Sequence, residues 1–192
     1  MADEQNKVLF GLSDVAVAFK TSDGWDAPTK IPGAVNLSTD AEGDQSVFYA
    51  DNIAYYTANS NAGYSGDLEI ANIPDALMAK MLGWKVDKSG ALVEIADGVP
   101  TPFALLFSVS GDKAKRRAVM YNVTASRPSD EWATTEDKTD VTALKLPYTA
   151  TPIEVGENKI VKAAIEPTTA NKEKYDAWYT KVFEPDFTSA SA

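Results

Sequence analysis

Carboxylates are the residues of this sequence whose spacing comes closest to a catalytic arrangement. Asp67 lies two positions before Glu69, and Asp130 directly precedes Glu131. Two carboxyl groups that face each other across a cleft can serve as acid and base in glycoside hydrolysis. Nothing in the sequence places either pair across a cleft, and carboxylates on strands or loops are usually solvated. We therefore predict that neither pair is catalytic.

A third acidic group is formed by Asp40, Glu42 and Asp44. Oxygen ligands suit hard cations, but the twelve-residue calcium-binding loop with its terminal Glu is missing here. A solvated acidic turn explains the group more simply. We predict no metal site, and an ion bound by this acidic loop stays open as the alternative.

The chain contains no histidine and no cysteine. The commonest general base and metal ligand is therefore absent, and so are all disulfides and thiolate sites. Nucleophile elbows and phosphate-binding loops are missing as well. These absences predict that the protein is not an enzyme and binds no cofactor.

The charge balance restricts the partners of the protein. Asp and Glu number 28 against 18 Lys and Arg, which gives a formal net charge of −10. A surface that grips nucleic acid needs the opposite balance, because Lys and Arg must neutralise phosphates. The basic cluster Lys115, Arg116 and Arg117 is too short to change this conclusion. Either it is a solvated strand end, or it forms salt bridges to an acidic neighbouring subunit.

Neither a signal peptide nor a membrane span is expected. Residues 1–7 are polar and acidic, without the basic and apolar regions of a secretory signal. The longest apolar run, residues 103–107, is far too short to cross a bilayer.

Alternation of apolar and polar residues predicts a mainly β structure. In residues 64–70, Ser65, Asp67 and Glu69 share one strand face and apolar side chains share the other. Residues 103–109 are apolar on both faces, as expected of a central strand. Residues 74–82 predict a helix, with Pro74 at its start, Gly83 at its end and an apolar stripe between them. A second helix is predicted over residues 170–183.

The expected fold is α+β and mainly β: a β-sandwich or half-barrel with one flanking α-helix and a long inter-strand loop. The length of 192 residues fits one domain over 1–192. Within it we expect an N-terminal arm at about 1–12, a long loop at about 40–62 and a C-terminal helix or arm at about 168–192.

The long loop is both aromatic and polar. Loops of this length inside a compact domain are often functional, and tyrosine suits protein contacts because its large ring carries a polar tip. The rings either contact another subunit or fold back on their own core. The residues concerned are Phe48, Tyr49, Asp51, Asn52, Tyr55 and Tyr56.

Several motifs, in order, resemble the major tail proteins of long-tailed, non-contractile bacteriophages, the siphophages. The resemblance covers nearly the whole chain, and it rests on the order and spacing of the motifs rather than on any single one. They are GAVNLS at 33–38, FYADN at 48–52, GYSGDLE at 63–69, the helical stretch at 73–83, RRAVMYNV at 116–123 and WYTKVFEP at 178–185.

The resemblance implies a structural protein of the virion, made in the cytoplasm of the host bacterium. In that family, hexameric rings stack into the hollow tail tube through which the DNA passes into the host without specific binding. The implied partners are other copies of the chain, the tape measure protein, and the tail terminator and distal tail proteins. Inner strands would join into a continuous barrel, while the long loop and both arms would contact the next ring.

A lumen-facing surface follows from this resemblance together with the strand pattern. One polar strand face and its expected neighbour would form an acidic wall that repels phosphates. The predicted lumen residues are Asn36, Ser38, Asp40, Ser65, Asp67 and Glu69.

A different class of function remains as the alternative. A monomeric β-sandwich binding module, for example one that binds carbohydrate, could use exposed Tyr and Trp side chains as stacking platforms. It would present a shallow aromatic groove.

Overall fold

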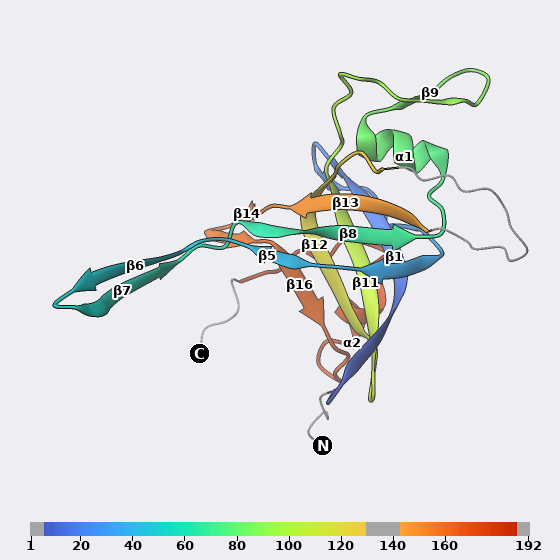
Figure 1. Cartoon of the computed structure of the whole chain (residues 1–192). Coiled ribbons are helices and arrows are strands. Elements are labelled where there is room, and N and C mark those ends of the chain that lie inside the picture. Colours follow the sequence, from blue (N-terminus) through green and yellow to red (C-terminus); the bar gives the residue numbers. More distant parts are fainter. Residues whose placement is uncertain (1–5, 130–142, 188–192) are drawn as a thin grey trace, which may run out of the picture.

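The computed structural model describes residues 6–129 and 143–187. A ten-stranded antiparallel sheet dominates the molecule (Figure 1). Its strands are β1 (Leu9–Thr21), β2 (Gly24–Trp25), β3 (Thr29–Lys30), β4 (Ala34–Leu37), β5 (Asp40–Glu42), β8 (Gly63–Ile70), β11 (Phe103–Gly111), β12 (Arg116–Ala125), β13 (Leu144–Ala150) and β16 (Lys162–Ile165). Seven of them follow the order β2–β1–β11–β12–β13–β8–β4 across the sheet. Of the other three, β3 pairs with β1, β5 pairs with β8, and β16 pairs with β12. The last strand, β4, also contacts β1, so the sheet curls into a half-barrel.

Small strand pairs and short helices complete the described part of the chain. They are the pairs β6 (Gln45–Ala50) with β7 (Ile53–Asn59), β9 (Lys85–Val86) with β10 (Leu92–Val93) and β14 (Ile153–Val155) with β15 (Asn158–Ile160), and the helices α1 (Asp75–Leu82), α2 (Lys172–Asp176) and the 3-10 helix η1 (Ala177–Tyr179). The predicted fold class, mainly β with few helices, is therefore confirmed.

The sheet separates two apolar cores. Successive residues of β11 point to opposite faces, so that Leu105 lies in the first core and Leu106 in the second. This double burial agrees with the central position predicted for the strand, which pairs with β1 on one edge and β12 on the other. The first core is covered by α1 and the second by the C-terminal segment, on opposite sides of the molecule (Figure 1).

The helix predicted over 74–82 is present as α1. Pro74 precedes its first turn, and Gly83 ends it in the left-handed conformation with a φ of 73°. A Cβ at Gly83 would also lie 2.6 Å from the backbone of Val99, so only glycine fits there. Met78 and Met81, which belong to the apolar stripe of the helix, are buried in the first core.

The C-terminal helix predicted over 170–183 is wrong in extent. The α-helical part is α2 alone, which begins after Asn171, and η1 follows it. The ring of Trp178 is buried in the second core, where its Nε1 donates to the carbonyl of Ala118 at 3.3 Å and it stacks on Phe183. Packing of these rings on the sheet overrides the helical spacing of the sequence.

The segment predicted as an irregular loop over 40–62 is extended instead. Asp40 and Glu42 belong to β5 at the sheet edge rather than to an acidic turn, and β6 and β7 form a β-hairpin. Residues 9–12 of the predicted N-terminal arm likewise belong to β1. The pair Asp130 and Glu131, residues 1–5 and residues 188–192 lie outside the described residues.

Candidate functional site

The hairpin of β6 and β7 projects away from the sheet (Figure 1). Its two strands pair only with each other in the described part of the chain. At the tip, Asp51 and Asn52 both have positive φ, 52° and 62°, between the paired residues Ala50 and Ile53. Two-residue hairpin turns of the primed types require such angles, and Asp and Asn tolerate them better than most residues. The sequence therefore closes the hairpin by local turn chemistry.

The base of the hairpin is held by the backbone. The amide of Ser60 donates to the carbonyl of Asp44 at 2.9 Å, and the amide of Ala62 donates to the carbonyl of Glu42 at 2.8 Å. Gly43 permits this approach, because a Cβ there would lie 2.1 Å from the carbonyl oxygen of Ser60. The hairpin is thus tied to β5, and through β5 to β8 in the main sheet.

Both faces of the hairpin carry large apolar side chains. Phe48 lies opposite Tyr56 in the register, and Tyr49 lies opposite Ala54 with Tyr55 as the extra residue of a bulge. Side chains alternate along a strand, so Phe48 and Tyr56 share one face while Tyr49 lies on the other. The large residues are 61–71% exposed: Phe48, Tyr49, Ile53, Tyr55 and Tyr56. The alternative that these rings fold back on their own core is therefore wrong.

The hairpin also lacks charge. Among residues 45–59, the single charged residue is Asp51 at the tip. Interface cores are depleted of charged residues and enriched in aromatic ones. An isolated two-stranded hairpin is only marginally stable in water. A projecting, uncharged and aromatic hairpin is therefore suited to packing against another surface.

Five of the six residues predicted to face a lumen, all except Ser38, come together on one face of the sheet. In β8, Ser65, Asp67 and Glu69 alternate with apolar residues of which Leu68 and Ile70 are buried. The register places Asn36 of β4 beside Glu69 and Asp40 of β5 beside Ser65. These five residues therefore lie on one face of the sheet. That this face is directed toward a lumen stays a prediction.

Ser38 occupies the break between β4 and β5. Its Oγ accepts a hydrogen bond from the amide of Asp67 at 2.9 Å, and its own amide donates to the carbonyl of Asp67 at 3.0 Å. The hydroxyl of Tyr148 donates to the carbonyl of Ser38 at 2.8 Å. Ser38 thus joins the edge strands to β8 and β13, in addition to lying near the polar face.

Sequence reasoning missed two charged residues of this face. Lys145 of β13 lies beside Glu69 in the register, and its Nζ is 3.3 Å from a carboxylate oxygen of Asp67. Glu42 of β5 accepts a hydrogen bond from the hydroxyl of Ser65. The face is therefore acidic on balance but not uniformly so. Alternation in residues 144–150 could have indicated Lys145, but only the register shows which carboxylate it meets.

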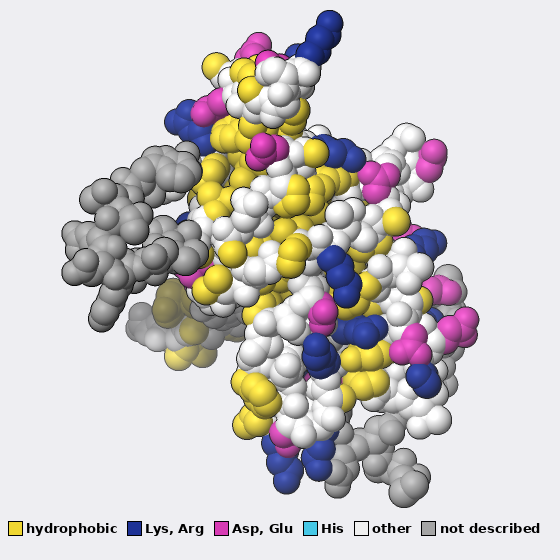
Figure 2. Space-filling view, turned by 90° about the vertical axis from the view of Figure 1, so that its right-hand side faces the viewer, with side chains coloured by type: hydrophobic (Ala, Val, Ile, Leu, Met, Phe, Trp, Pro, Cys, Tyr) yellow, Lys and Arg dark blue, Asp and Glu magenta, His cyan; other side chains and the backbone are white. Residues whose placement is uncertain are grey.

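The basic cluster is largely paired within the chain. Lys115 lies 3.1 Å from Asp14, and Arg116 lies 3.5 Å from Glu166. Arg117 stacks on the ring of Tyr175, with its guanidinium carbon 3.9 Å from the ring centroid. On the face shown in Figure 2, basic and acidic side chains are interspersed rather than separated by sign.

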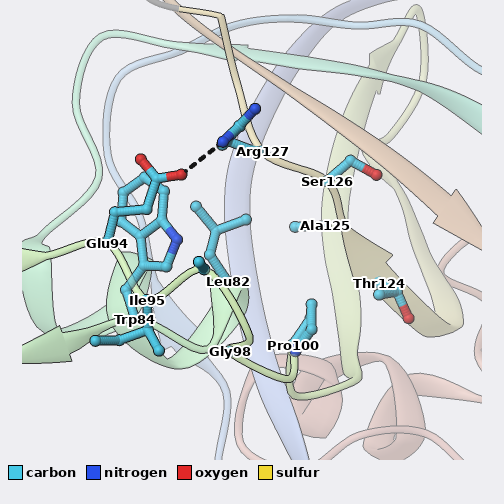
Figure 3. Close-up of a pocket in the computed structure, with 11 residues that line it drawn as sticks. Leu82, Trp84, Glu94, Ile95, Gly98, Pro100, Thr124, Ala125, Ser126 and Arg127 are labelled. Atoms are coloured by element: carbon cyan, nitrogen blue, oxygen red, sulfur yellow. Dashed lines mark hydrogen bonds and ion pairs between the residues drawn. The ribbon is translucent and has the colours of Figure 1, made fainter.

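A cavity of about 680 Å³ lies between the end of α1 and the end of β12. Leu82, Trp84 and Pro100 contribute to its lining (Figure 3). Its two charged residues, Glu94 and Arg127, pair with each other at 2.8 Å. Because Glu94 is paired with Arg127, its carboxylate is not free to act as a general base in this geometry.

Two tyrosines, Tyr121, which is buried, and Tyr179, which is partly buried, serve the structure. The hydroxyl of Tyr179 lies 2.7 Å from the hydroxyl of Ser108, and burial raises the pKa of Tyr179 to about 12. Burial also raises the pKa of Tyr121, which donates to the carbonyl of Phe183 at 2.7 Å. Both side chains connect the C-terminal segment to the sheet as neutral hydroxyls.

Neither a metal-binding cluster nor a membrane-spanning helix occurs in the described part of the chain. Within residues 6–129 and 143–187, no group of three or more acidic side chains is arranged to hold a metal ion. None of the helices there is long and apolar enough to cross a membrane.

Comparison with solved structures finds chains of similar structure. No protein-family model and no curated protein sequence matches the chain. A chain in the cryo-EM structure of the anti-feeding prophage baseplate, 6-fold symmetrised, is similar with a TM-score of 0.43 and 10% sequence identity. The match covers 84% of this chain and 97% of that chain.

Proposed function

We propose that the protein is a structural, non-enzymatic component of a bacteriophage tail. In this proposal, copies of the chain form hexameric rings that stack into the hollow tube through which phage DNA passes into the host. Its other partners are the tape measure protein and the tail terminator and distal tail proteins that the sequence resemblance implies. The motifs that resemble siphophage major tail proteins supply the identity of the assembly.

The projecting hairpin is the observation that carries the proposal. Five large apolar side chains stand more than half exposed on two strands that have no further strand partner in the described residues. Burial of one such side chain contributes about 1.5–3 kcal/mol. A monomer forgoes that stabilisation, whereas an assembly of identical subunits recovers it in every copy.

The edge of the sheet supports the same proposal. β5 pairs with β8 alone among the described strands, so its other edge is open. Open edges are a hazard for a monomer but are satisfied when neighbouring subunits continue the sheet. The adjoining polar face, with Asp40, Asp67 and Glu69, would then line the inside of the ring. Carboxylates along this wall would repel the phosphates of passing DNA.

Electron microscopy of the concentrated, purified protein tests the proposal, alone and with tail-initiating components. Rings with six-fold symmetry, or tubes built from them, are the expected result. Monomers that persist under both conditions would refute the tube function.

A carbohydrate-binding module is the second candidate, since exposed tyrosines also stack on sugars. Tyr49 and Tyr55 are exposed but lie on a projecting hairpin rather than in a groove. A glycan array separates the candidates: specific binding by the monomer favours the module, and a complete lack of hits removes it.

A further inference from the structure

The cavity between the end of α1 and the end of β12 has an aromatic wall. Trp84 follows α1, lines the cavity and packs against the first core, so its ring is held in place. Leu82 and Pro100 extend the apolar lining. The cavity volume of about 680 Å³ lies within the range of roughly 300–1,000 Å³ that is typical of ligand pockets. A small molecule could therefore rest against the indole ring.

The ribbon of β9 and β10 places a carboxylate beside this ring. Lys85 pairs with Val93 in the register of the two strands. Trp84 and Glu94 are the next residues outward, and they lie near each other in Figure 3. Glu94 in turn pairs with Arg127, which follows β12, and the side chains of this pair are 47% and 73% exposed. The ion pair thus forms a rim that a ligand can reach.

The ion pair keeps hydrogen-bonding capacity for a ligand. Within the described residues, a single hydrogen bond of 2.8 Å joins Nη1 of Arg127 to Oε1 of Glu94. A guanidinium carries five N–H donors, and a carboxylate accepts at two oxygens. In the described part of the chain, most donors of Arg127 and one oxygen of Glu94 are therefore left for other partners. The cavity offers donors and acceptors together beside an aromatic face.

The charge of the lining selects a neutral ligand. Glu94 would repel an anion and Arg127 would repel a cation, while the two charges together cancel. A purely apolar ligand would take water from the ion pair and replace none of its hydrogen bonds. The class that fits is a neutral molecule with one apolar face and several hydroxyl groups. A pyranose ring has this form, since C–H groups cover its face and hydroxyls surround its edge.

We propose that this cavity binds a neutral carbohydrate, with one pyranose ring stacked on Trp84. One sugar hydroxyl donates to the carboxylate of Glu94, and another accepts from the guanidinium of Arg127. The inference goes beyond the tube function and does not rest on it. It also assigns carbohydrate binding to a cavity of the body rather than to the hairpin tyrosines. Because α1 and the hairpin lie on opposite sides of the molecule (Figure 1), a neighbouring copy that covers the hairpin would not by that contact block the cavity.

Calorimetric titration and saturation-transfer NMR with four neutral trisaccharides test the site: cellotriose, maltotriose, chitotriose and mannotriose. At least one should bind the parent protein with a Kd of about 1 mM or lower. Arg127→Gln should raise that Kd about tenfold or more, because it removes charged hydrogen-bond donors. Glu94→Gln should weaken binding in the same way. Lys145→Gln is the matched control and should leave the Kd unchanged, since it removes a cation that pairs with a carboxylate elsewhere, at Asp67.

Two further variants locate the bound sugar. Trp84→Phe keeps an aromatic side chain against the first core but offers a smaller face, so it should weaken binding. Its melting temperature checks that the protein stays folded. Tyr49→Thr with Tyr55→Thr removes exposed rings of the hairpin and should leave the Kd unchanged. Binding that is lost in this hairpin variant but kept by Arg127→Gln would overturn the cavity as the site.

The remaining outcomes are equally decisive. If none of the four trisaccharides binds, the inference is overturned. Guanosine is the competing ligand, because its base can also stack on an indole and hydrogen-bond to a guanidinium and a carboxylate; binding of guanosine without any sugar would overturn the ligand class. Electron microscopy of the same samples tests the tube function separately. Rings without sugar binding would overturn the site alone, whereas sugar binding that depends on Arg127 in a protein that forms no rings would support the site and refute the tube.

Discussion

Replacing the aromatic pair on either face of the hairpin should weaken assembly without unfolding the subunit. One double variant, Phe48→Thr with Tyr56→Thr, removes the pair on one face, and another, Tyr49→Thr with Tyr55→Thr, removes the rings opposite. Threonine retains a high preference for strands, so the hairpin itself should persist. Because the rings contact mainly water in the free subunit, its free energy of unfolding should change little.

The size of the effect follows from the exposed fraction. These side chains are roughly two-thirds exposed, so complete burial would contribute about two-thirds of the usual 1.5–3 kcal/mol, or about 1–2 kcal/mol per ring. Two rings are then worth about 2–4 kcal/mol per contact. Since 1.4 kcal/mol corresponds to a factor of ten, the assembly concentration should rise from about thirtyfold to several hundredfold.

Sedimentation velocity over a concentration series measures the shift, and denaturant unfolding of the dilute subunit controls for stability. Val99→Thr serves as the surface control, since it removes an exposed apolar side chain elsewhere. Similar shifts for both double variants would mean that the hairpin is covered on both faces. Assembly at the parental concentration by both variants would refute the assignment of the hairpin as an interface.

Three further predictions concern the second core, the polar face and an ion pair. Trp178→Ala should destabilise the subunit by about 3–5 kcal/mol in denaturant unfolding, because a buried ring leaves a cavity; a loss below 1 kcal/mol would contradict the anchoring role. Asp67→Lys with Glu69→Lys should permit tube assembly but impair genome ejection, and unimpaired ejection in a phage assay would contradict the lumen assignment. The hydrogen bond from Lys115 lowers the pKa of Asp14 in the folded protein. The ionised carboxylate therefore stabilises the fold fully at pH values above its unfolded pKa of about 3.9. This stabilisation is lost as the pH falls through the lower pKa of the folded state. Asp14→Asn should therefore flatten the loss of stability at acidic pH, and an unchanged pH profile would count against the ion pair.

Local patterns predicted those parts of the fold in which neighbouring residues determine the structure. The alternation in β8 separates Asp67 and Glu69 from the buried Leu68 and Ile70, and that separation depends only on the pleat of a strand. α1 was predictable because Gly83 terminates it locally. The C-terminal helix was overestimated because the position of Trp178 is determined by packing against the sheet, which helical spacing does not encode.

The polar face was only partly predictable, for a reason of register. Asp67 and Lys145 are far apart in the sequence and meet because β8 and β13 pair in one particular alignment. A shift of one residue would place Lys145 on the opposite face. The residues of a single strand face can therefore be named from the sequence, whereas the net charge of a multi-strand face cannot.

The hairpin was the hardest element to recognise because its two faces are alike. A half-buried strand alternates apolar and polar residues, but Phe48 and Tyr49 are both large and aromatic, and so are Tyr55 and Tyr56. The missing alternation led to the prediction of an irregular loop. The same absence argues for an interface, because a hairpin that lay on its own sheet would need one apolar face and one polar face. A hairpin without a polar face has no side suited to water, so its sequence is best explained by partners that cover both sides.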